Sequence, residues 1–135
     1  MHNLSITSDQ SLEQVQKAFH AEFPFLKIEF FTKKHHEGGS SWSKNMIQDI
    51  DKLLKELGSK NENGVLIANS RMKVSDFEQE FQNIFGFGVQ VFRKSKEIWL
   101  ETTQTDDWNL EYQNHQGKEH TETFTSMEYD PREES

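Results

Sequence analysis

Two similar stretches of sequence decide the fold: FPFLKIEFF, residues 23–31, and FGFGVQVFR, residues 85–93. Each joins closely spaced phenylalanines to a segment in which apolar and polar residues alternate. A residue that ends helices, Pro24 or Gly86, stands near each junction. Alternation with a period of two is typical of a strand with one buried face. Both stretches therefore predict the end of a helix followed at once by a strand.

The similarity extends upstream of both stretches and predicts an internal repeat. At an offset of 62 residues the aligned pairs are Leu4/Leu66, Leu12/Val74, Val15/Phe77, Phe19/Phe81, Phe23/Phe85 and Phe25/Phe87. A slip of one residue then aligns the strand pairs Leu26/Val89 and Ile28/Val91. We interpret residues 3–31 and 65–93 as two copies of one unit. Independent convergence on one pattern is the alternative.

Each copy reads as strand, helix, strand. The helical stripes are Leu12, Val15, Phe19 and Phe23 in the first copy and Val74, Phe77, Phe81 and Phe85 in the second. Ser11 and Gln14 predict a capping box, whereas Lys73 is a poor cap and Ser75 a better one. A helix that joins two strands through short connections predicts parallel strands with a right-handed crossover.

A hairpin follows the second copy in RKSKEIWLETT, residues 93–103. A turn at Ser95–Lys96 would place Phe92 opposite Trp99, and Val91 opposite Leu100.

Three further segments complete the chain. Residues 46–57 predict an amphipathic helix, because Met46, Ile50, Leu53, Leu54 and Leu57 share one face. Residues 33–43 predict a loop. Residues 105–114 predict a helical turn or short helix that closes the core.

The predicted fold class is α+β. We expect two β-α-β repeats in one mixed sheet of about five strands, with helices mainly on one face, in a ferredoxin-like arrangement. A ubiquitin-like β-grasp is the alternative. Residues 1–116 form the expected single domain. Residues 117–135 form the expected disordered tail, because residues 114–135 hold six acidic and two basic residues, half of the net charge of −8.

The segment VSDFEQEFQNIFGFGVQVFRKSKEIWLETTQTDDWNLEYQN, residues 74–114, resembles a family of small bacterial proteins of unknown function. Its VQVFRK strand, Trp-Leu strand and T-D-x-W-x-L ending carry the resemblance, which covers about a third of the chain. The resemblance implies a fold type and a bacterial origin, and it implies no mechanism.

Composition narrows the possible functions. Mean hydropathy is −0.88, but 11 Phe and 3 Trp provide enough apolar area for a core. A net charge of −8 argues against binding to a nucleic-acid backbone. The absence of cysteine excludes disulfides and thiolate metal sites. No apolar run approaches the roughly 20 residues that span a bilayer, and no secretory signal is visible, so we expect a cytoplasmic protein that contacts no membrane.

Catalytic, metal and cofactor sites are not predicted. His35, His36 and Glu37 are adjacent, and neighbouring side chains rarely chelate one metal ion together. Asp106 and Asp107, with Glu101 and Glu111 nearby, suggest an acidic cleft for a small enzyme or ligand-binding protein. The alternative for the aspartates is that one of them caps the turn before Trp108.

The predicted binding surface is the sheet face that points away from the helices. On this face we expect Phe31, Gln90, Phe92, Trp99 and Glu101, together with Lys27 and Glu29. Aromatic residues among charged ones are typical of protein interfaces. The sequence thus favours a non-catalytic interaction or adaptor domain, whose ligand is a protein partner or a second copy of the chain. The alternative is that residues 46–57, Trp42 or Phe124 cover this face.

Overall fold

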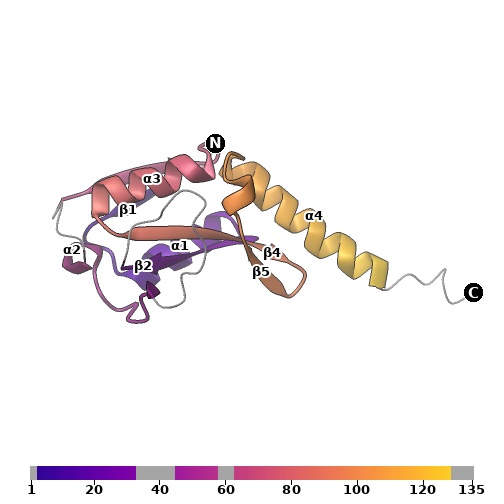
Figure 1. Cartoon of the computed structure of the whole chain (residues 1–135), viewed down its shortest axis with the longest axis horizontal. Helices are drawn as coiled ribbons and strands as arrows, with labels where there is room; N and C mark the ends of the chain where they lie inside the picture. Colours follow the sequence, from indigo (N-terminus) through magenta and orange to yellow (C-terminus); the bar gives the residue numbers. More distant parts are fainter. Residues whose placement is uncertain (1–2, 33–44, 58–62, 129–135) are drawn as a thin grey trace, which may run out of the picture.

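The computed structural model describes residues 3–32, 45–57 and 63–128 (Figure 1). The elements in chain order are β1 (Asn3–Thr7), α1 (Leu12–Glu22), β2 (Leu26–Phe31), α2 (Leu54–Leu57), β3 (Val65–Asn69), α3 (Val74–Phe85), β4 (Gly88–Ser95), β5 (Ile98–Glu101), the 3₁₀ helix η2 (Thr103–Thr105) and α4 (Leu110–Glu128). The predicted α+β class is confirmed.

The strands form two sheets and not one. β1 pairs with β3, and β2, β4 and β5 form a three-stranded sheet in the order β2-β4-β5. All three pairings are antiparallel. The predicted single mixed sheet is therefore wrong, and neither the ferredoxin-like arrangement nor the β-grasp is confirmed. The physical reason is that each strand bonds to its counterpart in the other copy, so the two strands of one β-α-β unit enter different sheets.

The registers of both sheets place aligned residues opposite each other. Ser5 pairs with Ile67 at the centre of the β1–β3 ladder, and these residues are 62 positions apart. Ile28 pairs with Val91 in the β2–β4 ladder, the pair that the one-residue slip aligns. Two like units related by a two-fold axis pair in this way. The duplication itself stays a prediction, which these registers favour.

The hydrophobic core lies between the two sheets and the helices α1 and α3. Phenylalanines from both predicted stripes meet there. The ring centroids of Phe19 and Phe77 are 5.4 Å apart, and those of Phe30 and Phe81 are 5.6 Å apart. All four rings are fully buried. Large aromatic areas removed from water are what allow so polar a chain to form a core.

Local signals set the bounds of both core helices. In α1, Ser11 Oγ accepts from Gln14 N–H at 3.1 Å, and Ser11 N–H donates to Gln14 Oε1 at 2.8 Å. This is the predicted capping box. Gly86 ends α3 in the left-handed conformation with φ of 87°, which glycine adopts without a steric penalty.

The N-terminus of α3 has no side-chain cap, since Lys73 is the N-cap residue. Its free N–H groups bond instead to the chain after β5. Val74 N–H donates to the carbonyl of Trp108 at 3.0 Å, and Ser75 N–H donates to the carbonyl of Asp106 at 2.7 Å. The backbone thus satisfies the donors that a capping side chain would otherwise serve.

The predicted helix over residues 46–57 is wrong except for its last turn, α2. The segment before α2 makes short turn bonds within itself, such as Ile50 N–H to the carbonyl of Gln48 at 3.1 Å, but no helical ladder, and it also bonds to neighbouring elements. Ile47 N–H donates to the carbonyl of Phe30 at 2.8 Å, and Leu12 N–H donates to the carbonyl of Lys52 at 3.0 Å. Of the predicted apolar stripe, Leu54 is buried in the core and Ile50 and Leu57 pack against it, while Ile47, outside the stripe, is buried as well.

The predicted β4–β5 hairpin is present, but its register differs by two residues. Trp99 lies opposite Lys94, and Phe92 lies opposite Glu101. The turn includes Lys96 in the left-handed region, with φ of 60°. A shift of two residues keeps every side chain on the predicted face of the sheet.

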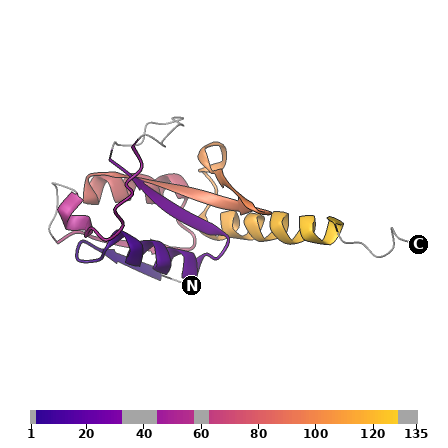
Figure 2. The same cartoon turned by 90° about the horizontal axis from the view of Figure 1, so that it is seen from below.

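The helix at the end of the chain is longer than predicted. Instead of a short turn within residues 105–114, α4 begins at Leu110 and continues to Glu128. It extends from the body of the domain (Figures 1 and 2). The segment predicted to be disordered, residues 117–135, is therefore helical over its first part, because Gly117 packs closely on Phe25. Residues 129–135 lie outside the described residues.

Candidate functional site

The residues of the predicted binding surface do lie on one face of the three-stranded sheet. Lys27, Phe92 and Glu101 are opposite one another on β2, β4 and β5. Lys94 and Trp99 form a second row of the same face. Side chains two residues apart on a strand point the same way, so this polar face is opposite the core.

Burial divides the five predicted residues into two groups. Phe31 and Gln90 are fully buried, so a partner cannot touch them in this structure. Phe92 and Trp99 are half-buried, and Glu101 is exposed. The accessible part of the predicted surface is therefore its outer part, around Phe92 and Trp99.

Lys27 organises this accessible part. Its Nζ atom lies 5.4 Å from the centroid of the Phe92 ring and 5.2 Å from that of Trp99. These distances suit cation–π attraction to both rings. Lys27 Nζ also lies 3.4 Å from Glu29 Oε2, and Glu29 Oε1 accepts from Gln16 Nε2 at 3.2 Å. The network ties the surface to helix α1.

A shallow groove of about 370 Å³ runs beside this network. Its lining comes from α1, β2 and β5: Gln16, Lys17, His20, Ala21, Lys27, Ile28, Glu29 and Trp99. The His20 ring meets the Trp99 ring edge-on, with centroids 6.2 Å apart, and His20 Nδ1 lies 2.9 Å from the carbonyl oxygen of Leu26. The groove thus has aromatic and aliphatic walls with charged groups at its rim. We call these lining residues together with Phe92 the Trp99 surface.

A buried carboxyl group on α3 was not anticipated by the sequence analysis. Glu78 is only 6% exposed, and its Oε2 accepts from Val91 N–H at 2.8 Å. The β4–β5 ladder begins one residue later, so this side chain takes the place of a neighbouring strand. Burial, with repulsion from Asp106 and Glu101, raises the pKa of Glu78 to about 8, although the Val91 hydrogen bond opposes the rise.

Two sequence signals could have found Glu78. It lies four residues after Val74 and three before Phe81, within the apolar stripe of α3. It also aligns with Gln16 at the offset of 62, and Gln16 Nε2 donates to the carbonyl of Ile28 at 3.0 Å. Corresponding helix positions thus bond to corresponding strand positions in the two copies.

The predicted acidic cleft does not take the expected form. Asp106 is half-buried near Glu78, whereas Asp107 and Glu111 are exposed. Neither aspartate lines the groove beside Trp99 or the two polar grooves below. At the start of α4, after Trp108, Asn109 Oδ1 accepts from Tyr112 N–H at 2.7 Å. The alternative that an aspartate caps the turn before Trp108 stays a prediction.

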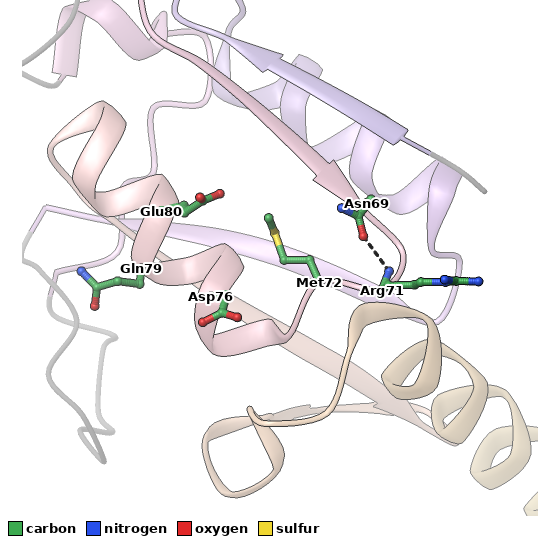
Figure 3. Close-up of a pocket in the computed structure, with 6 residues that line it drawn as sticks. All are labelled: Asn69, Arg71, Met72, Asp76, Gln79 and Glu80. Carbon is green, nitrogen blue, oxygen red and sulfur yellow. Dashed lines mark hydrogen bonds between the residues drawn. The ribbon is translucent and has the colours of Figure 1, made fainter.

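Two polar grooves meet at Arg71. The first, of about 390 Å³, is lined by Asn69, Arg71, Met72, Asp76, Gln79 and Glu80 (Figure 3). The second, of about 740 Å³, is lined by Arg71, Asn109, Glu111, Tyr112, Asn114, His115 and Lys118. In Figure 3 the Arg71 side chain extends away from Asp76 and Glu80. The first groove combines Asp76 and Glu80 with Arg71, and the second combines Arg71 and Lys118 with Glu111.

Metal-binding residues do not gather in the part of the chain that the structure describes. Residues 3–32, 45–57 and 63–128 contain no cluster of three or more His, Asp or Glu side chains that could hold an ion. His35, His36 and Glu37 lie outside the described residues.

Comparison with known proteins gives no relative. No protein-family model matches the chain, and neither the curated proteins nor the solved structures contain a significant match. The resemblance of residues 74–114 to a bacterial family therefore stays a prediction. Over the described residues, no helix has the length and apolar character needed to cross a bilayer.

Proposed function

We propose that this domain is a non-catalytic protein-interaction module that binds its partner through the Trp99 surface. The observation that carries the proposal is the half-buried Trp99 ring, which shares Lys27 with Phe92 and forms one wall of the groove. Tryptophan is the residue type most enriched among energetically dominant interface positions. The position of this ring beside a groove supports a role as the anchor of the complex.

The charges around the groove indicate the chemistry of the partner. Lys17, Lys27 and His20 line the groove, and Glu29 is the one acidic residue among its lining. Both lysines pair with carboxylates, Lys27 with Glu29 at 3.4 Å and Lys17 with Glu13 at 3.8 Å, so the groove is bordered by paired charges of both signs. We expect the partner to place an apolar side chain in the groove and charged groups against these pairs. Screening of these charges should weaken binding as salt increases.

The test is affinity capture from a lysate of the source cell, with three forms of the protein. The wild type should retain a partner that the double variant Phe92→Ser with Trp99→Ser loses. The matched control is Ile67→Ser, because Ile67 is also exposed and apolar, at 50%, but lies on the other sheet. Folding of each form is checked first by urea denaturation.

Two results would contradict the proposal. Equal retention by all three forms would show that Trp99 is not the anchor. Global unfolding of the double variant at neutral pH would show that both rings belong to the core.

A second candidate is a small enzyme or ligand-binding protein that uses the acidic groups near Asp106 and Asp107. Burial raises the pKa of Glu78, and the nearby Asp106 and Glu101 raise it further; this perturbed carboxyl group favours the second candidate. A ligand of this site would raise the melting temperature of the wild type and not that of Asp107→Asn. A metabolite and metal panel without any such shift would count against it.

A further inference from the structure

The outer edge of β5 carries backbone groups to which none of the described strands bonds. Lys94 N–H donates to the carbonyl of Phe25 at 2.9 Å, on the β2 side of β4. Lys94 and its opposite residue Trp99 are therefore a non-hydrogen-bonded pair of the β4–β5 ladder. It follows that the N–H and C=O of Trp99, and those of Glu101 two residues on, point away from β4. Within the described residues no hydrogen bond engages these outward groups.

The opposite edge of the same sheet, formed by β2, is hydrogen-bonded to other parts of the chain. The outer edge of β2 is covered, because Gln16 Nε2 bonds to the carbonyl of Ile28 and Ile47 N–H bonds to the carbonyl of Phe30. Edge strands in soluble proteins are usually covered, charged or interrupted in some such way. The sheet thus has one protected edge and one open edge.

The side chains of β5 also differ from those of a protected edge. Ile98 is 59% exposed, and Trp99 and Leu100 are half-buried, so apolar groups flank the open backbone on both faces. The tip of the β4–β5 hairpin projects from the body of the domain in Figure 2, and its turn is held to α4 by the hydrogen bond from Lys96 N–H to Thr121 Oγ1 at 3.2 Å. An accessible apolar edge is the feature that binding by strand addition requires.

We propose that β5 pairs antiparallel with β5 of a second copy of the chain, around a two-fold axis at Leu100. The two three-stranded sheets then form one continuous sheet. Trp99 lies opposite Glu101 of the second copy, and Glu101 lies opposite its Trp99. Each of these two pairs exchanges two backbone hydrogen bonds. The interface uses the backbone edge of β5, so it does not rest on the proposed partner binding, although Trp99 takes part in both.

Charge selects this register over its neighbours. A two-fold axis at Trp99 would place Glu97 opposite Glu101 of the second copy, and an axis at Glu101 would place the two Glu101 side chains opposite each other. Like charges directly opposite each other destabilise a strand pair. With the axis at Leu100, the Glu101 carboxylate faces the Trp99 side chain, whose indole N–H is a donor.

The first test introduces single cysteines, which is informative because the chain has none. The two Leu100 positions would form a non-hydrogen-bonded pair with Cα atoms about 4.5 Å apart, within the range of a disulfide. Leu100→Cys should therefore form a disulfide-linked dimer under mild oxidation. Ile98→Cys is the matched control, because it lies opposite Thr102 of the second copy. We expect dimer formation about tenfold faster for Leu100→Cys, and equal rates would overturn the proposal.

The second test uses the protein without introduced cysteines. It therefore tests the β5 interface even if a cysteine variant is unstable. In sedimentation experiments the wild type should change from a 15.9 kDa monomer to a dimer as its concentration rises. Glu101→Pro removes an outward N–H without breaking the β4–β5 ladder and should stay monomeric. A wild type that stays monomeric to about 1 mM, or a dimer that Glu101→Pro leaves intact, would refute the β5 interface.

Discussion

At the scale of single residues, the least expected feature is the carboxyl group of Glu78. A buried carboxyl group with no cation beside it favours its neutral form. Glu78 Oε2 accepts a hydrogen bond from the N–H of Val91. Without it this N–H would have no partner, because the β4–β5 ladder ends at Phe92. The side chain is therefore part of the fold, and its charge state links stability to pH.

Glu78 should make the protein less stable as pH rises. Its pKa is about 8 in the folded protein and has its ordinary value of 4.5 in the unfolded chain. Between these values the folded state holds a proton that the unfolded state has lost, so the free energy of unfolding falls from pH 4.5 to pH 8. The loss is on the order of a few kcal/mol.

The variant Glu78→Gln mimics the neutral acid and should remove this loss. Urea denaturation from pH 5 to pH 8.5 should show it more stable than the wild type at the upper end. Glu80→Gln, which changes an exposed residue of the same helix, is the control. The same pH dependence in wild type and Glu78→Gln would mean that Glu78 is ionised in the folded state.

Burial also explains why the sequence identified the binding surface only in part. Strand alternation places Phe31, Gln90, Phe92, Trp99 and Glu101 on one face, and the observed registers agree. Alternation gives the direction of a side chain but not what covers it. Phe31 and Gln90 are buried, and that fact depends on tertiary packing, which no local pattern encodes.

At the scale of elements, local sequence patterns correctly predicted the helices whose stability depends on local interactions. The apolar stripes and the capping box of Ser11 gave α1 and α3, because a helix bonds to itself. They failed for residues 46–57, whose backbone bonds to β2 and α1. They failed again for α4, whose polar sequence becomes helical beside the sheet.

The docking of α4 depends on Gly117. A Cβ atom there would lie 2.9 Å from Phe25 Cβ and 3.0 Å from its carbonyl oxygen. Glycine to alanine in an exposed helix normally stabilises by about 0.5–1 kcal/mol. Gly117→Ala should instead destabilise by about 1–3 kcal/mol, since the helix must move off the sheet.

Urea denaturation measures whether Gly117→Ala lowers the free energy of unfolding, instead of raising it as in an exposed helix. Lys118→Ala is the control, because Lys118 is exposed at the next position of the same helix. If Gly117→Ala proved as stable as the wild type or more so, the close packing of α4 on Phe25 would be refuted.

At the scale of the whole molecule, the topology could not be read from either copy alone. A single β-α-β unit predicts parallel strands in one sheet. Here each strand finds an antiparallel partner in the other copy, so the two halves complete each other's sheets. The pairing of Ser5 with Ile67 and of Ile28 with Val91 links this arrangement to the alignment of the copies. Only long-range contacts distinguish the two topologies.

Comparison of the two similar halves, residues 3–31 and 65–93, also shows which elements belong to only one of them. Gln16 and Glu78 occupy corresponding positions, but β5, η2 and α4 follow only the second copy. Trp99 comes from this added part and lies against His20 of the first copy. Among the described residues, the Trp99 surface therefore has no counterpart in the other half.

The most direct test of partner binding at the Trp99 surface is photo-crosslinking in the living source cell. A photoactivatable aromatic amino acid is placed at the position of Trp99 in one strain and at that of Ile67 in another. From the first position we predict one discrete adduct with another protein, separate from the adduct of twice the 15.9 kDa chain mass that pairing of two β5 strands would give, and none of that mass from the second position. No adduct with another protein from the first position, or the same adducts from both, would contradict a partner-binding role for this surface.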